Sequence, residues 1–254
     1  MSARLRPTVD VFLASFKRPD KLAAMIESVR ESGYPARVLV AAGDLGTVET
    51  CERYPGLVEC VFSSAVNRRV GCTAPLNLVF RTLVRNDALF CTDDCVFAPD
   101  ALDIAMSTLH ERFPDTDGVV GLAQENIAGA YDLAFPLMGR KFLDRFRQLP
   151  PEFTRGRAHS AAASGAAGGL GLGQPGDLFW PGYFHLFNDA EIGLTIKCMG
   201  NWVFEPRAKL RHFHPEFGGG EMDATHDHGL TFKNEDAIAW TTRRREGKLW
   251  GADA

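Results

Sequence analysis

The sequence predicts an α/β fold in which a mostly parallel sheet is flanked by helices. Short apolar segments rich in β-branched and aromatic residues alternate with longer segments whose apolar residues recur at helical spacing. Strands joined by helical connections of this length pair in parallel, and the helices cover both faces of the sheet. With 254 residues and 45% hydrophobic content, the chain can bury one large core. We therefore expect a single domain over residues 1–254.

The first half of the chain contains the most regular elements. Strands are expected, in order, at residues 9–14, 36–44, 57–62, 88–92 and near 118–122. A helix follows the first strand and ends at Gly33, and a second helix, containing Leu76 and Leu83, precedes the fourth strand. Pro99 is expected to open a third helix, because the nitrogen of a first-turn proline has no proton to leave unpaired.

The second half is less regular. A short amphipathic helix is expected at residues 138–147. Residues 155–176 are so rich in Gly, Ala and Ser that they predict a mobile loop, which would be a lid, a linker or an engineered replacement. A later helix is expected to end at Gly200, with strands on either side of Pro206. Residues 241–248 are expected to form a solvated helix end, and His226 and His228 to lie in a surface loop.

Composition argues against several classes of protein. The net charge is −4 and the isoelectric point is about 6.0, so no broad attraction to nucleic acid or anionic membranes is expected. Six cysteines occur without a C-x-x-C pair, which favours reduced thiols over a disulfide framework or a structural zinc site. No apolar stretch reaches the ~18 residues of a membrane span, and no signal peptide is expected. We therefore expect a soluble cytoplasmic protein.

Two adjacent carboxylates follow the fourth strand, in the segment FCTDDCVFAPD at residues 90–100. Ligands of parallel sheets bind beyond the carboxyl ends of the strands, where Ser15, Asp44, Asp93 and Asp94 are all expected. A divalent cation would offset the repulsion within the pair. Mg²⁺ and Mn²⁺ prefer oxygen ligands and usually share their shell with phosphates, so a diphosphate is the natural partner. Alternatively, one aspartate caps the next helix and the other is a solvated turn residue.

Six motifs occur in an order that resembles GT-A fold glycosyltransferases. They are SFKRPDKL, Asp44, NRRVGCTAPLN, TDDCVFAPDAL, NDAEIG and EPRAKLRHFH. The chain is most similar to the family 2 type and to N-acetylglucosaminyltransferases whose metal motif reads acid-Asp-Asp, over roughly residues 8–214. The resemblance implies a Rossmann-like GT-A sheet. It also implies a nucleotide-sugar-binding half over residues 1–122 and an acceptor-side, catalytic half over residues 123–254, which includes the mobile loop.

The resemblance further implies a donor pocket. Asp44 would contact the base or the ribose of a nucleotide sugar, and Ser15 and Arg18 would line the same pocket. Where no cation is present, Arg68 or Arg69 would have to balance the charge of the diphosphate.

The family's metal motif normally reads D-x-D, and this chain departs from it. The likeness makes Asp94 the ligand of Mn²⁺ or Mg²⁺ and Asp93 a partner of the ribose or of the ligand shell. Cys95 stands where an acid would otherwise be expected. A histidine after the P-x-A element completes the metal site in this fold, which points to His212, with His214 as the alternate.

The resemblance makes Asp189 the catalytic base of an inverting enzyme. A carboxylate in that role removes a proton from the acceptor hydroxyl as this oxygen attacks the anomeric carbon. Alternatively, Asn188 or Asp189 is an N-cap. Glu191 would orient a neighbour or contact the acceptor. Trp180 and Tyr183 would stack on a sugar or a base, or belong to the core.

These expectations combine into one functional hypothesis and two rivals. The chain would be an inverting, metal-dependent glycosyltransferase that moves a sugar from a nucleotide-diphosphate donor, first of all a UDP-sugar, to an acceptor hydroxyl. The rivals are a sugar-nucleotide nucleotidyltransferase and a noncatalytic nucleotide-sugar-binding module. The acceptor stays open among saccharide, protein, lipid, small molecule and hydroxylated bases in DNA, since arginines at 140–157 and 243–245 leave a polynucleotide possible.

Overall fold

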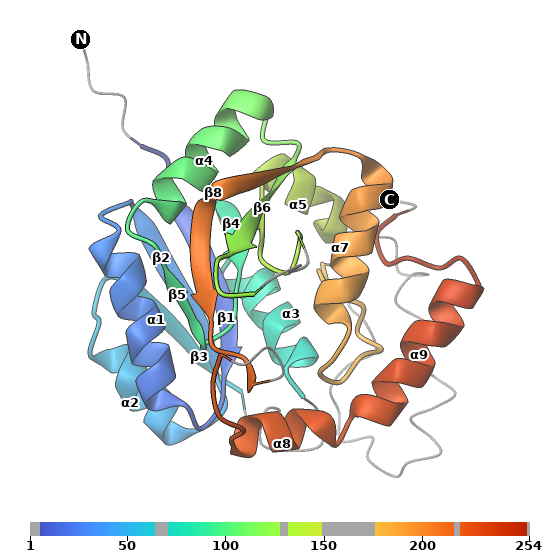
Figure 1. The fold of residues 1–254 in the computed structure, drawn as a ribbon, viewed down its shortest axis with the longest axis horizontal. Coiled ribbons are helices and arrows are strands. Elements are labelled where there is room, and N and C mark those ends of the chain that lie inside the picture. The colour runs from blue at the N-terminus through green and yellow to red at the C-terminus, as the bar shows by residue number, and fades with distance from the viewer. Residues whose placement is uncertain (1–5, 64–70, 128–131, 149–175, 216–218, 253–254) are drawn as a thin grey trace.

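The chain folds into an eight-stranded sheet with helices packed on both of its faces (Figure 1). The computed structural model describes residues 6–63, 71–127, 132–148, 176–215 and 219–252. The strands are β1 (Val9–Ser15), β2 (Ala36–Ala42), β3 (Val58–Phe62), β4 (Asp87–Phe90), β5 (Cys95–Phe97), β6 (Val119–Gln124), β7 (Pro136–Met138) and β8 (Trp202–His212). The helices are α1 (Pro19–Glu31), α2 (Leu45–Glu52), α3 (Thr73–Thr82), α4 (Ala101–Arg112), α5 (Arg140–Arg147), α7 (Asn188–Met199), α8 (Ala224–Leu230) and α9 (Lys233–Arg245).

The sheet is mixed, so the expectation of a mostly parallel sheet is only partly right. The strand order is β3-β2-β1-β4-β7-β6-β8-β5. Strands β3, β2, β1 and β4 pair in parallel, as expected for strands joined by helices, and β6 pairs in parallel with β8. Strand β7 runs antiparallel to both β4 and β6, and β5 runs antiparallel to β8. Both β5 and β7 are three-residue strands, too short for hydrophobic periodicity to reveal.

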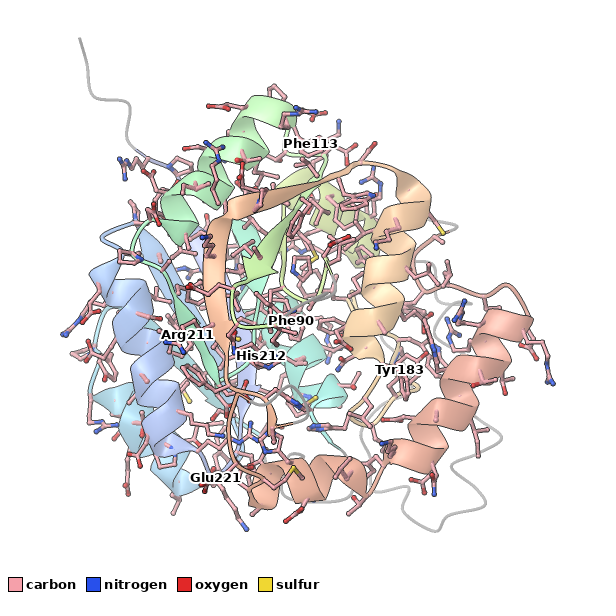
Figure 2. All side chains as sticks on the ribbon, viewed as in Figure 1. Phe90, Phe113, Tyr183, Arg211, His212 and Glu221 are labelled. Carbon is pink, nitrogen blue, oxygen red and sulfur yellow. The ribbon has the colours of Figure 1, made fainter. Side chains whose placement is uncertain are left out.

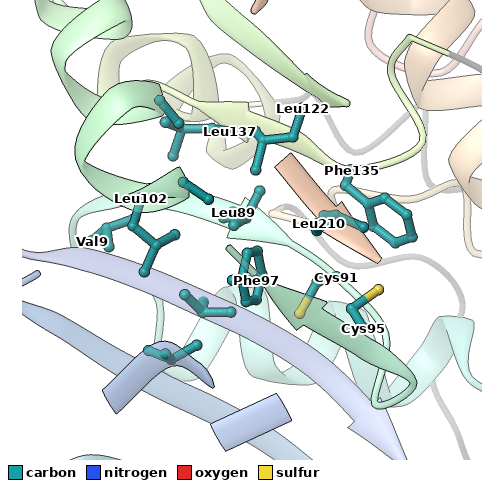
Figure 3. Packing of buried hydrophobic residues seen from close by; sticks show 14 of the residues in the cluster. Val9, Leu89, Cys91, Cys95, Phe97, Leu102, Leu122, Phe135, Leu137 and Leu210 are labelled. Carbon is teal, nitrogen blue, oxygen red and sulfur yellow. The ribbon is translucent and has the colours of Figure 1, made fainter. Parts of the chain in front are cut away.

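Two apolar clusters lie on the two faces of the sheet, because successive side chains of a strand point to opposite faces. Val11 and Leu13 of β1 belong to the cluster that packs against α1 and α4. Phe12 belongs to the other cluster, which packs against α3, α5 and α7. Figure 3 shows part of the first cluster, where Cys91 and Cys95 are buried thiols within the apolar packing.

Three elements differ from the predicted ones. Helix α2 was not expected, and it begins directly after Asp44, whose side chain accepts a hydrogen bond from the backbone N–H of Thr47 as an N-cap. Helix α4 begins at Ala101 rather than at Pro99. Two strands were expected on either side of Pro206, but β8 runs through this residue as one strand. Its pairing with β6 shifts register at this point. Such a bulge tolerates proline, because the bulged residue does not have to donate an N–H to the neighbouring strand.

Some residues with a predicted role lie in segments that the structure does not describe. Residues 155–175 of the expected loop, together with Arg68 and Arg69, lie outside the described residues. Within the described ranges, no helix combines the length and the apolar composition needed to cross a lipid bilayer.

The buried carboxylate of Asp10 ties three segments together at the start of β1. Its oxygens accept hydrogen bonds from Arg37 Nε and Nη2, both at 2.9 Å, and from the backbone N–H groups of Arg85 at 2.7 Å and Asn86 at 2.9 Å. Burial by itself raises the pKa of Asp10, but these hydrogen bonds outweigh it and the pKa is lowered overall. Asp10 therefore stabilises the fold as an ionised group.

Replacing Asp10 by Asn is expected to lower the free energy of unfolding by about 2 kcal/mol near pH 7, because a buried charged acceptor is lost. Since the folded-state pKa is lowered, the contribution is complete above the unfolded pKa of about 3.9 and is lost as the pH falls through the folded value. Urea unfolding of both proteins at several pH values measures this. If the difference in free energy of unfolding between the two proteins grew as the pH fell, Asp10 would not stabilise the fold as an ionised group.

Candidate functional site

Polar side chains gather where three parallel strands end. Ser15 ends β1, Asp44 follows β2, and Asp93 and Asp94 follow β4. The sequence-based placement of these residues at one edge of the sheet is confirmed. Strand β8 adds His212 to this edge, because its pairing with β5 sets Cys95 opposite His212. Figure 2 shows His212 at the end of β8.

Asp93 is a buried carboxylate whose two oxygens both have donors. Ser15 Oγ donates to Oδ2 at 2.8 Å, and Arg18 Nη1 donates to Oδ1 at 3.0 Å. Burial and the neighbouring charge of Asp94 raise the pKa of Asp93, and Arg18 and Ser15 offset this only in part. Asp93 is therefore the member of the pair that is harder to ionise.

Asp94 is held in its ionised form. Thr92 Oγ1 donates to its Oδ1 at 2.6 Å, His212 Nε2 lies 3.4 Å from the same oxygen, and Arg18 Nη1 lies 3.4 Å from Oδ2. Burial raises the pKa of Asp94, but His212, Thr92 and Arg18 lower it by more. Repulsion within the buried pair is thus offset by one guanidinium that contacts both carboxylates.

His212 presents one ring nitrogen to Asp94. Its Nδ1 lies 2.9 Å from Gln124 Oε1. Because a carbonyl oxygen only accepts, Nδ1 donates to Gln124, and Nε2 is the ring nitrogen that faces Asp94. The backbone of His212 is fixed by Asn126, whose side chain accepts from its N–H at 2.9 Å and donates to its carbonyl at 2.8 Å. The ring is therefore oriented as in a metal-binding histidine.

The donor atoms at this edge fit a divalent cation. Single ligand atoms of Asp94, Cys95 and His212 all lie within 4.8 Å of one another. Burial raises the pKa of the Cys95 thiol, which also lies 3.2 Å from Thr92 Oγ1, so in the absence of a cation this thiol is held in its neutral form. Asp94 and His212 are therefore the pair suited to the ion, and a carboxylate with an imidazole suits Mn²⁺ better than Mg²⁺.

His226 also lies at this edge, so its expected place in a surface loop is wrong. It belongs to α8, and 8% of its side chain is exposed. Its Nε2 is buried without a hydrogen-bond partner and lies 3.8 Å from Asp94 Oδ2. The periodic pattern of α8 is too short to have predicted a helix here.

Asp44 has a structural role that the sequence did not reveal. Its carboxylate accepts from the backbone N–H of Lys17 at 2.6 Å and from Thr47 Oγ1 at 2.8 Å, in addition to capping α2. Burial raises the pKa of Asp44, and the hydrogen bonds from Lys17 and Thr47 lower it further than burial raises it. Asp44 thereby ties the loop after β1 to the start of α2, and its contact with a nucleotide stays a prediction.

Asp189 lies in the first turn of α7 and is not its N-cap. Phe187 holds the N-cap position with a φ of 65° and no side-chain cap, and Asn188 is the first helical residue. Asp189 is half-buried, and lost solvation raises the pKa of its carboxyl against the lowering influence of nearby N–H groups and of His212 and His214. A raised pKa suits a general base.

Glu191 lies in a buried network rather than on an open surface. Its carboxylate accepts from Tyr183 Oη at 2.6 Å, from Arg243 Nε at 3.0 Å and from the backbone N–H of Trp250 at 2.7 Å. The expected solvated helix end at residues 241–248 is therefore wrong for Arg243, which also lies 4.1 Å over the ring of Trp180. Of the two roles predicted for Glu191, the geometry favours orienting neighbours.

Sequence reasoning missed Asp236, which supports the segment leading into α7. It is fully buried in the first turn of α9, and its carboxylate accepts from the backbone N–H groups of Phe184, His185 and Leu186, each at 2.8 Å. The partners lie about 50 positions away in the chain, so no local signal could have identified them.

No family model and no curated protein matches this chain. Among solved structures, it is similar to a fragment of TarS from S. aureus, with 16% identity and a TM-score of 0.40 over 50% of this chain and 39% of that one. The same fragment in complex with UDP-GlcNAc has 17% identity and a TM-score of 0.40, over 50% of this chain and 36% of that one. A further TarS structure has 16% identity and a TM-score of 0.37, over 51% of this chain and 24% of that one. The chain thus spans less than two thirds of each of these structures. A likeness at these values carries no conclusion about family or activity.

Proposed function

We propose that this chain is an inverting, metal-dependent glycosyltransferase that uses a nucleotide-diphosphate sugar, first of all a UDP-sugar. One observation carries the proposal: the ionised Asp94 and the oriented Nε2 of His212 meet at the carboxyl edge of the sheet, with Nε2 lying 3.4 Å from Oδ1 of Asp94. Such an edge is where ligands of α/β sheets bind. The order of motifs that resembles GT-A fold glycosyltransferases agrees with it.

In this proposal Asp94 and His212 hold Mn²⁺ or Mg²⁺, which when bound supplies positive charge for the departing diphosphate. Asp189 accepts the proton of the acceptor hydroxyl as that oxygen forms a bond to the anomeric carbon. The bond from the anomeric carbon to the diphosphate oxygen breaks on the opposite face, and its electron pair leaves with the diphosphate. The configuration of the sugar is therefore inverted.

The remaining predicted contacts belong to the proposal as well. Ser15, Asp44 and Asp93 would line the donor pocket, with Arg69 beside the diphosphate, although Arg69 lies outside the described residues. Trp180 is half-buried and would meet the acceptor. We assign the donor to the half of the chain over residues 1–122 and the acceptor to residues 123–254.

A thermal-shift panel of nucleotide sugars with and without Mn²⁺ tests the proposal. A UDP-sugar with Mn²⁺ is expected to raise the unfolding midpoint, because a ligand that binds only the folded state at 100 times its Kd stabilises it by about 2.7 kcal/mol. A chelator, or Asp94→Ala, is expected to remove the metal-dependent part of the rise. Asp103→Ala, at an exposed carboxylate of α4, is the matched control and is expected to keep it.

Two outcomes would contradict the proposal. The absence of a response to any nucleotide would remove its basis. A response to UTP together with a sugar 1-phosphate, with release of pyrophosphate and no use of UDP-sugars, would instead identify a nucleotidyltransferase.

A further inference from the structure

The guanidinium of Arg18 has two edges that serve different partners. Its Nη1 contacts the acidic pair, Asp93 and Asp94. Its other edge faces Asp223: Nε donates to Oδ2 at 2.9 Å and Nη2 donates to Oδ1 at 2.8 Å. Two parallel bonds of this kind are the geometry with which arginine binds either a carboxylate or a phosphate.

Lys21 adds a second cation to the same carboxylate. Its Nζ lies 2.9 Å from Asp223 Oδ2, and about a third of the lysine side chain and 30% of the aspartate side chain are exposed, whereas Arg18 is 8% exposed. His226 Nδ1 lies 2.7 Å from Arg18 Nη2 and 2.9 Å from Asp223 Oδ1. Lys21 and Asp223 are thus partly open to solvent, whereas the guanidinium of Arg18 is buried.

Asp223 reaches this place from a distant part of the chain. It is the N-cap of α8, where its Oδ1 accepts from the backbone N–H groups of Thr225 at 3.0 Å and His226 at 3.1 Å. Helix α8 lies across the carboxyl-end edge of the sheet (Figure 1). Thr225 Oγ1 donates to the carbonyl of Phe16, directly after β1, and this bond holds α8 at that edge.

We propose that the Nε–Nη2 edge of Arg18 and Nζ of Lys21 form an oxyanion subsite for a phosphate group of the donor, and that Asp223 occupies this subsite until the ligand displaces it. That the ligand is a nucleoside diphosphate rests on the proposed function. That the subsite takes a phosphate oxyanion rests only on the two cations and their geometry. An internal carboxylate on the same donors competes with the ligand, so the apparent Kd is the intrinsic Kd divided by the fraction of molecules in which Asp223 has left.

The substitution Asp223→Asn separates the charge of Asp223 from its role as a helix cap. Asparagine caps helices as well as aspartate does, so α8 keeps its start, but a neutral amide competes weakly for two cations. We expect the variant to bind both UDP and inorganic pyrophosphate about tenfold more tightly than the natural chain, as when a competent fraction of about a tenth rises toward one. Isothermal titration calorimetry without added metal measures both affinities.

Two control variants define the cause of the gain. Asp227→Asn removes the same charge from an exposed position of α8, and its affinity is expected to stay within about twofold of the natural value because exposed charges are screened. Thr225→Val loosens α8 without changing any charge, and it is expected to leave the affinity below that of Asp223→Asn.

Lys21→Met removes the second cation of the proposed subsite and is expected to weaken pyrophosphate binding several-fold.

The results distinguish this subsite from the proposed function. Equal affinities of Asp223→Asn and Asp227→Asn, or a gain reproduced in full by Thr225→Val, would overturn the subsite even if UDP-sugars bind and react. Tighter pyrophosphate binding by Asp223→Asn, together with a failure of every UDP-sugar to bind, would instead support the subsite and overturn the glycosyltransferase.

Discussion

Asp189→Asn is expected to slow the release of UDP from a UDP-sugar by about 100-fold to 10,000-fold, the contribution typical of a positioned general base. Asparagine has nearly the same shape but cannot accept the proton of the attacking hydroxyl. The change lies in the first turn of α7, where either residue is tolerated, so the fold is expected to persist. In the absence of an identified acceptor, water serves as the attacking group, and the measured quantity is UDP released per enzyme per minute.

Donor binding provides the internal control for this prediction. The midpoint shift caused by the UDP-sugar and Mn²⁺ is expected to be the same in Asp189→Asn as in the natural chain, because the role proposed for Asp189 is on the acceptor side. Asp103→Asn, an equivalent change in the first turn of α4, is expected to leave both quantities unchanged. A chain that binds the donor but releases no UDP, with or without Asp189, would be a noncatalytic binding module.

Asp236→Ala is expected to lower the free energy of unfolding by about 4 kcal/mol. The substitution removes an acceptor that is fully buried and leaves the backbone N–H groups of Phe184, His185 and Leu186 without their partner. Each buried, unsatisfied donor costs about 1–3 kcal/mol, and water entering the space left by the side chain offsets part of the sum. Urea unfolding monitored by circular dichroism measures the loss.

The neighbouring residue Glu235 provides the matched control. Both acids lie in the first turn of α9, but Glu235 is exposed. Glu235→Ala removes the same interaction with the helix dipole and none of the three buried hydrogen bonds, so its unfolding midpoint is expected to stay close to that of the natural chain. Equal losses in the two variants would show that Asp236 contributes only as a charge at a helix start.

The same segment connects stability to the site. Residues 184–186 lead directly into the first turn of α7, which carries Asp189. In Asp236→Ala at a temperature where the variant is folded, UDP release is expected to fall while donor affinity is retained, since the donor contacts proposed above lie on other elements. A loss of both in proportion would indicate global unfolding instead.

The elements with long, regular patterns were predictable. Strands β1, β2 and β4 are short apolar runs, helices α1 and α3 have apolar residues at helical spacing, and the sequence-based positions of all five agree with the structure. The edge that holds Ser15, Asp44, Asp93 and Asp94 followed from these strands alone, because parallel strands end at the same edge. Short elements were not predictable: β5 and β7 carry three residues each, and α8 carries seven.

The roles of individual polar residues depended on partners far away in the chain. Asp93 and Asp94 are adjacent in sequence, yet the guanidinium that makes their burial tolerable is 75 positions away, on the loop before α1. The sequence predicted that Glu191 contacts the acceptor or orients a neighbour. In the structure its carboxylate oxygens accept hydrogen bonds from Tyr183, Arg243 and Trp250. The place of His226 beside Asp94 depends on α8 folding back across the sheet.

The sequence by itself determined the α/β class, the first strands and helices, and the edge where the acidic pair lies, because hydrophobic period and turn chemistry are local properties. Only the tertiary structure decided that the sheet is mixed and that Asp94, rather than Asp93, is the more readily ionised member of the acidic pair. It also decided that Asp236 supports the segment before α7 and that Asp223 binds the guanidinium of Arg18. Charge, burial and hydrogen bonding at these positions arise between segments separated by tens to hundreds of residues, and no local pattern encodes which of them meet.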